Sequence, residues 1–254
     1  MFDAIADMQS AYVLCGVIWS VALGFAVGNY ACSLVHRLPR GRLILDKKPY
    51  CGECGTLLST RDLFPVFSAL MLRHKCRYCG TPFPVSHTWT EILVGVLFVL
   101  AFFKYGFGEQ YILASAISVF LIVIAAIHAN ENMIMGKMVL AVAVFGMMHR
   151  ILVDHTVYNF FEGGLFALII GVVLWHRQVK KVGHIYALPK PVELLAVGGL
   201  CVGAALLPQF LVLYAVLFVV GWLLGKMRGR AIPYTVAYGF AISLTILYPD
   251  IILL

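Results

Sequence analysis

Charged residues are scarce in this chain of 254 residues. Only 12% of the residues are Asp, Glu, Lys or Arg, whereas about a quarter are charged in a typical soluble domain. Hydrophobic residues make up 62% of the sequence, and its mean hydropathy is +0.93. This composition excludes an ordinary soluble protein and predicts an integral membrane protein. A basic segment is also lacking near the beginning, where Asp3 and Asp7 stand instead, so we expect no cleavable signal peptide.

Long apolar runs, by contrast, occupy most of the sequence. Most of them are long enough to cross a hydrocarbon core of about 30 Å as an α-helix. We therefore predict an all-α, polytopic membrane protein with about eight transmembrane helices. The sixth and seventh runs are short and are separated only by Pro208-Gln209, so we expect a tight turn there. The predicted spans are residues 11–35, 90–107, 110–129, 133–152, 157–176, 192–208, 209–225 and 232–252.

Basic residues are unevenly distributed between the loops on the two sides of the predicted bundle. With the N-terminus outside, 17 of the 19 Lys and Arg residues lie in segments on the cytoplasmic side, and only Lys104 and Arg150 remain outside. This asymmetry follows the positive-inside rule and predicts a membrane protein in that orientation. Contact with the anionic headgroups of the lipid bilayer accounts for the formal net charge of +7, and we expect no nucleic-acid partner.

Two Cys-x-x-Cys pairs interrupt the apolar sequence within a basic segment. Cys51 and Cys54 form the first pair, and Cys76 and Cys79 form the second. Four thiolates at this spacing can close a tetrahedral shell around zinc. Two disulfides, which a reducing cytoplasm disfavours, or four free thiols are the alternatives. We predict a structural zinc site in a small, zinc-ribbon-like cytoplasmic insertion. The predicted organisation is a first transmembrane helix in 1–36, the tetracysteine zinc subdomain in 37–88 and a helical membrane domain in 89–254.

The sequence blocks around the cysteine pairs carry a family resemblance. GFAVGNY at 24–30 is followed by HRLP at 36–39, DLFPVFS at 62–68 lies between the pairs, WTE at 89–91 opens the second span, and AIPY occupies 231–234. Together these blocks resemble the type IV prepilin peptidases, bacterial membrane aspartic proteases that also N-methylate the trimmed prepilin. The resemblance covers essentially the whole chain, and the membrane domain resembles the protease core of that family.

This resemblance implies partners and cofactors as well as a fold. The partners would be the N-terminal helices of prepilins or pseudopilins and the assembly proteins of type IV pili or type II secretion. Zinc would be a structural cofactor, and S-adenosylmethionine would be the methyl donor of any retained methyltransferase activity.

The same resemblance reveals a departure at the two membrane aspartates with which this family cuts. Two carboxylates that share one proton can activate water and protonate the leaving amine. Here the two positions correspond to His128 and Pro191, and neither neighbourhood contains an aspartate. Glu131 and Glu193 lie three and two residues further on. They are weak substitutes, because proline fixes φ beside Glu193 and small displacements of catalytic groups already slow a reaction strongly.

Two side chains in the membrane domain and at its entrance leave alternatives open. His128 is most simply an interfacial residue or a hydrogen-bonding partner of a neighbouring helix, although with Glu131 and His184 it can form a second metal site. Glu91, at the beginning of the second predicted span, is expected to be a buried or functional carboxylate.

The sequence therefore favours a non-proteolytic member of the prepilin peptidase family that binds prepilin-type helices or assembly partners. The alternative is an enzyme, either a leader peptidase with unrecognised carboxylates or a protein that retains only the S-adenosylmethionine-dependent N-methyltransferase activity. No strand followed by a glycine-rich turn, the mark of a soluble methyltransferase, is present. A transporter or channel is disfavoured, because the midplanes of the predicted spans carry almost no ionisable residues.

Overall fold

A computed structural model describes residues 2–41, 54–57, 75–81, 86–179, 190–229 and 232–249 of the chain. The chain divides into two compact units, Met1–Phe107 and Gly108–Leu254. Regular structure in the described residues is helical, as the long apolar runs predict. His184 and Cys51 lie outside the described residues.

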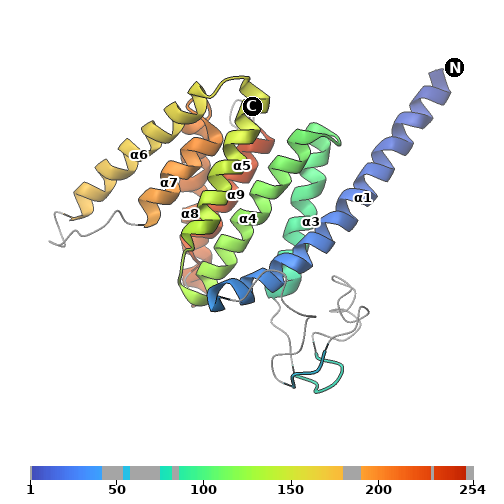
Figure 1. The fold of residues 1–254 in the computed structure, drawn as a ribbon, viewed down its shortest axis with the longest axis horizontal. Coiled ribbons are helices and arrows are strands. Elements are labelled where there is room, and N and C mark those ends of the chain that lie inside the picture. The colour runs from blue at the N-terminus through green and yellow to red at the C-terminus, as the bar shows by residue number, and fades with distance from the viewer. Residues whose placement is uncertain are drawn as a thin grey trace. The chain divides into compact units, whose positions relative to one another are not determined.

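The first unit contains two long helices that pack side by side (Figure 1). Helix α1 spans Phe2–Arg37 and ends in the short 3-10 helix η1, Leu38–Arg40, while α3 spans Ser86–Tyr105. Their backbones approach closely at glycines: a Cβ atom added to Gly24 would lie only 2.6 Å from the Cα atom of Gly95. Such small residues are typical of helix pairs in membranes, where close backbone contact supplies the packing.

A buried polar pair lies at the same interface. Glu91 is only 7% exposed, and its Oε1 atom accepts a hydrogen bond of 3.2 Å from the Nδ2 atom of Asn29. The prediction that Glu91 is a buried carboxylate is thus confirmed. A buried carboxylate is stabilised when it receives hydrogen bonds of this kind.

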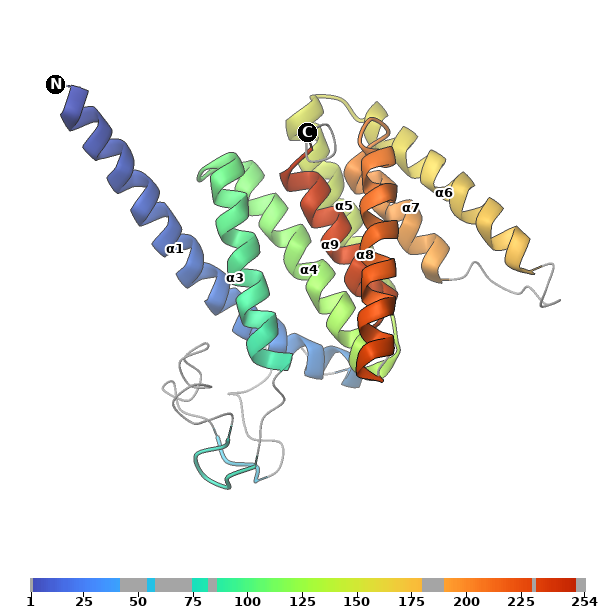
Figure 2. The same cartoon turned by 180° about the vertical axis from the view of Figure 1, so that it is seen from behind.

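The second unit is a bundle of six helices within the described residues (Figure 2). Helix α9 packs against α4, α7 and α8, whereas α7 also packs against α5 and α6, and α4 packs against α5. The bounds are α4, Glu109–Glu131; α5, Gly136–Asp154; α6, Tyr158–Val179; α7, Lys190–Val202; α8, Leu207–Arg228; and α9, Tyr234–Leu247.

The eight α-helices of the described residues overlap in position with the eight predicted apolar runs. Six of these helices are long and apolar enough to cross a membrane. The chain is therefore a multi-pass membrane protein. Helices α7 and α9, with 13 and 14 residues, are shorter than the predicted spans and fall below the roughly 17 residues that a hydrocarbon core requires. The spanning segment of α8 is only 11% buried in the protein, as expected of a helix that faces lipid.

The connection between α7 and α8 differs from the prediction. We expected a tight turn at Pro208-Gln209, but α7 ends at Val202 and the break covers residues 203–206. Gly203 has a φ of +79°, a left-handed conformation that glycine adopts without strain. Pro208 instead lies in the first turn of α8, where a helix tolerates the missing N–H group.

Candidate functional site

Three of the predicted metal ligands come together in the first unit. The Sγ atoms of Cys54, Cys76 and Cys79 all lie within 4.8 Å of one another. Thiolates bound to zinc at about 2.3 Å in a tetrahedron would be separated by about 3.8 Å, so the three sulfurs are close to a metal-binding arrangement. Gly55 and Gly80, each in the left-handed conformation with φ of +69° and +73°, turn the chain immediately after a cysteine.

A threonine two residues after a cysteine contacts its sulfur in both cysteine turns. The thiol of Cys54 donates to Oγ1 of Thr56 over 3.3 Å, and the Sγ atom of Cys79 lies 3.2 Å from Oγ1 of Thr81. The hydrogen bond from the Thr81 side chain is the main cause that lowers the pKa of Cys79 from 9.0 to about 6, and a backbone hydrogen bond to Thr81 adds to it. A metal binds the thiolate rather than the thiol, so this hydrogen bond favours the ligating form.

The two threonines were not among the residues predicted from the sequence. The signal is nevertheless present, because the tripeptide Cys-Gly-Thr occurs twice, at 54–56 and 79–81. The repeat gives both turns the same glycine and the same hydroxyl. The buried Cys76, 3% exposed, holds the second turn through two backbone hydrogen bonds, donating from its N–H to Thr81 and accepting from Gly80.

A second group of functional candidates lies where α4 ends and α9 begins. His128, at the C-terminal end of α4, has its Nδ1 atom 2.9 Å from Oγ1 of Thr235. The ring of Tyr234 meets the imidazole edge-on, with centroids 4.9 Å apart. The prediction that His128 hydrogen-bonds a neighbouring helix is confirmed.

Helix α9 also contacts α7 near Pro191. The hydroxyl group of Tyr238 donates a hydrogen bond to the carbonyl oxygen of Leu194 in α7. Pro191 lies three residues before Leu194, exposed in the first turn of α7. The first half of α9 therefore touches both the helix that carries His128 and the helix that carries Pro191.

Neither of the two glutamates considered as substitutes lies in the environment of a carboxylate pair that shares one proton. Glu131 is exposed at the last residue of α4, next to Asn132 in a left-handed cap with φ of 51°. Glu193 forms an ion pair of 2.7 Å with Lys190 on the surface of its own helix.

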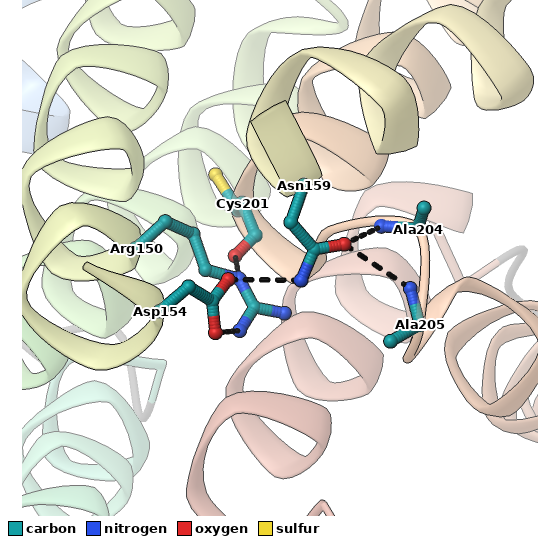
Figure 3. A network of polar contacts seen from close by, with 6 residues as sticks. All are labelled: Arg150, Asp154, Asn159, Cys201, Ala204 and Ala205. Atoms are coloured by element: carbon teal, nitrogen blue, oxygen red, sulfur yellow. Dashed lines mark hydrogen bonds and ion pairs between the residues drawn. The ribbon is translucent and has the colours of Figure 1, made fainter. Parts of the chain in front are cut away.

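A partly buried ion pair at the other end of α5 was not predicted from the sequence (Figure 3). Arg150 is 5% exposed. Its Nη1 atom lies 3.4 Å from Oδ1 of Asp154, and its Nε atom donates to the carbonyl oxygen of Cys201, at 3.2 Å, near the end of α7. Arginine thus satisfies one of the carbonyl groups that a helix leaves unpaired at its C-terminus.

Asn159 extends this network to the beginning of α8. Its Nδ2 atom donates to Oδ2 of Asp154 over 2.9 Å, while its Oδ1 atom accepts from the backbone N–H groups of Ala204 and Ala205 (Figure 3). The residues that form the network come from α5, α6, α7 and the turn between α7 and α8. From sequence alone, Arg150 was placed on the outer side, at the end of the predicted span 133–152, and no partner was predicted for it.

Comparison with known proteins gives a consistent set of matches. Residues 22–105 match the family model of the bacterial peptidase A24 N-terminal domain. A prepilin leader peptidase/N-methyltransferase of Xanthomonas campestris is 29% identical over 191 residues, which are 70% of this chain and 64% of that protein. A protein of the same description from Klebsiella pneumoniae is 24% identical over 204 residues, covering 75% of this chain and 86% of that protein.

The coverage of the relatives is uneven. The match to a prepilin leader peptidase/N-methyltransferase of Myxococcus xanthus, 28% identical over 114 residues, covers 45% of this chain but only 34% of that protein. In two of these three comparisons the chain thus spans less than two thirds of the relative's length. No solved structure gives a significant match.

Proposed function

We propose that the chain is an inner-membrane protein of the type IV prepilin peptidase family and that it binds prepilin- or pseudopilin-type helices without cutting them. The matched relatives are named as leader peptidases and N-methyltransferases. A partner shared with these relatives would present an apolar helix within the bilayer, where close packing between helices holds such complexes together.

The arrangement around His128 is the observation that carries the non-proteolytic part of the proposal. An aspartic protease needs two carboxylates that share one proton. At the first of these positions the chain has an imidazole that hydrogen-bonds Thr235, and at the second it has Pro191. An imidazole and a proline cannot share one proton as two carboxylates do, and Glu193 is paired with Lys190.

The cysteine cluster supports a structural metal in the same proposal. Cys54, Cys76 and Cys79 would hold zinc together with Cys51, which supplies the fourth thiolate. In isolated zinc peptides the metal contributes on the order of 10 kcal/mol to folding, and a subdomain this small cannot build a substantial core without such a contribution. The distribution of Lys and Arg supports a cytoplasmic position for this subdomain, with the N-terminus outside.

A cleavage assay with a matched relative tests the proposal. The purified chain and the Xanthomonas campestris relative would each be mixed with the same prepilin in detergent, and leader removal would be followed by mass spectrometry. We expect cleavage by the relative alone and photo-crosslinking of the prepilin helix to both proteins. Cleavage by this chain that is lost in Glu131→Gln or Glu193→Gln would show that it is a peptidase.

N-methyltransferase activity is a second candidate, favoured by one observation. The family-model match is confined to residues 22–105, which include the cysteine cluster but none of the helices that carry the family's aspartates. An activity that depends on this part can survive the loss of the dyad. Calorimetry with S-adenosylmethionine tests it: binding that disappears when the four cysteines become serine supports it, and the absence of heat contradicts it.

A further inference from the structure

We propose that α9 is a strut that sets the spacing between the end of α4 and the beginning of α7, and that Thr235 and Tyr238 are its positioning residues. The proposal rests on the proposed function, because these two helix ends are where a docked prepilin-type helix would replace the substrate of a protease. Neither residue belongs to the cysteine cluster, and neither occupies a position of the family's aspartates.

The two hydroxyl groups point to different helices. Thr235 is 1% exposed and contacts His128 on α4, whereas Tyr238 is 2% exposed and donates to the carbonyl oxygen of Leu194 on α7. The residues are three positions apart and therefore lie on neighbouring parts of one helix surface. A single rigid turn of α9 thus holds both helices at once.

Packing around these hydroxyl groups keeps each helix close to α9. Gly239 lies one turn after Thr235, and a Cβ atom there would be 3.4 Å from Cβ of Leu121 in α4. On the other side, a Cβ atom at Gly198 of α7 would be 3.1 Å from the ring of Tyr238. Small residues therefore bring both helices within reach of the hydroxyl groups, which supply directional contacts in an apolar environment.

These contacts matter for the proposed function, in which the end of α4 and the beginning of α7 carry no carboxylate pair. In a catalytic dyad, two carboxylates that share a proton link the helices that carry them. Here the described contacts at those helix ends run through α9 instead: His128 to Thr235, and Leu194 to Tyr238. The strut keeps the two ends at one spacing without a catalytic group, which preserves a docking position for an apolar helix after the chemistry has been lost.

The spacing can be measured in the full chain before any partner is added. Spin labels attached to keto amino acids at the exposed positions Ala129 and Lys190 avoid the native cysteines. Double electron–electron resonance in lipid nanodiscs would then give the distribution of distances between α4 and α7. Thr235→Val and Tyr238→Phe each remove one hydroxyl group and retain nearly the same volume.

Two matched variants control for the loss of a buried hydroxyl group or ring substituent. Thr245→Val makes the same change on the same helix, but Thr245 donates within α9 to the carbonyl oxygen of Ala241 over 2.7 Å. Tyr214→Phe changes a neighbouring ring, which meets the ring of Tyr238 at a centroid distance of 6.2 Å. Thr235→Ser restores the bridging hydroxyl group.

We expect the distance distribution to shift or broaden in Thr235→Val and Tyr238→Phe, to return in Thr235→Ser, and to stay unchanged in the two controls. Binding of a prepilin helix should fall by about threefold to tenfold in the same two variants, as expected for the loss of one interhelical hydrogen bond. An unchanged distribution in both variants, or an equal change in the controls, overturns the strut.

The partner measurement separates the two proposals. If the distances change as expected but the unaltered chain binds no prepilin helix, the proposed function is wrong, whereas the role of α9 as a strut is supported. If the unaltered chain binds and the variants bind equally well despite altered distances, the link between the strut and docking is wrong.

Discussion

The imidazole of His128 and the hydroxyl group of Thr235 are hydrogen-bonding partners, 2.9 Å apart, across the interface between α4 and α9. A carboxylate placed at position 128 would have to fit the same hydroxyl group and the neighbouring Tyr234 ring. Under the proposed function, protease chemistry would therefore require more than the exchange of one side chain.

Replacement of the two positions by aspartate should not restore cleavage. In His128→Asp/Pro191→Asp, the second carboxylate lies in the exposed first turn of α7, beside the ion pair of Lys190 and Glu193. A dyad needs two carboxylates that are close enough to share one proton. We expect no leader removal above background by mass spectrometry. Efficient cleavage by the double variant would show that the substitutions alone inactivated the chain.

Close packing of α6 on α7 provides a second prediction. A Cβ atom at Gly199 would lie 2.3 Å from the carbonyl oxygen of Gly163 and 2.4 Å from Cβ of Ala167. Gly199→Ala should therefore force the helices apart and lower the free energy of unfolding by about 1–3 kcal/mol. Gly221→Ala is the matched control, because the nearest atom there is 3.8 Å away. Unfolding in SDS would measure both, and equal stabilities would contradict the packing.

The network around Arg150 provides a third prediction. Arg150→Met leaves Asp154 without its cation and removes the hydrogen bond to the Cys201 carbonyl, so we expect a loss of about 3 kcal/mol in the free energy of unfolding. Lys190→Met removes the cation of the exposed pair with Glu193 and should change stability by at most about 1 kcal/mol. Similar losses in the two variants would mean that the burial of Arg150 contributes nothing to its pairing.

The helices could be predicted from the sequence because each apolar run carries its own signal. Tertiary contacts could not, because they depend on residues far apart in the chain. By sequence Arg150 is a basic residue at the outer end of a predicted span, and only the packing of α5 on α7 brings the Cys201 carbonyl to it. The break between the sixth and seventh predicted spans was placed too late, at Pro208, because proline is common both in turns and in the first turn of a helix. In the structure the chain turns at Gly203, and Pro208 lies in the first turn of α8.

The cysteine cluster, too, could be predicted from the sequence only in part. The ligand types and the spacing predicted a metal site, and Cys54, Cys76 and Cys79 do converge. The hydroxyl groups of Thr56 and Thr81 that contact two of the sulfurs belong to a tripeptide repeat whose meaning depends on the turn geometry. We expect elemental analysis of the purified chain to find about one zinc per chain, and none when the four cysteines are replaced by serine.

The hydrogen bond from Thr81 makes a final prediction about pH. Because it is the main cause that lowers the pKa of Cys79 to about 6, alkylation of Cys79 in the metal-free chain should rise through about pH 6. Thr81→Val removes that hydroxyl group and should move the midpoint upward, towards the ordinary value of 9.0. Thr81→Ser retains the hydroxyl group and should keep the low midpoint.

The same change should weaken metal binding in a way that depends on pH. Metal and proton compete for the thiolate. Above about pH 6 the unaltered Cys79 is already deprotonated, whereas in Thr81→Val, with its pKa moved towards 9.0, a proton must still be displaced. The deficit in zinc affinity of the variant should therefore be largest below about pH 6, should shrink as the pH rises from there, and should vanish at about pH 9. Competition with a chromophoric chelator would measure it, and a deficit that persists above pH 9 would point to a disrupted turn instead.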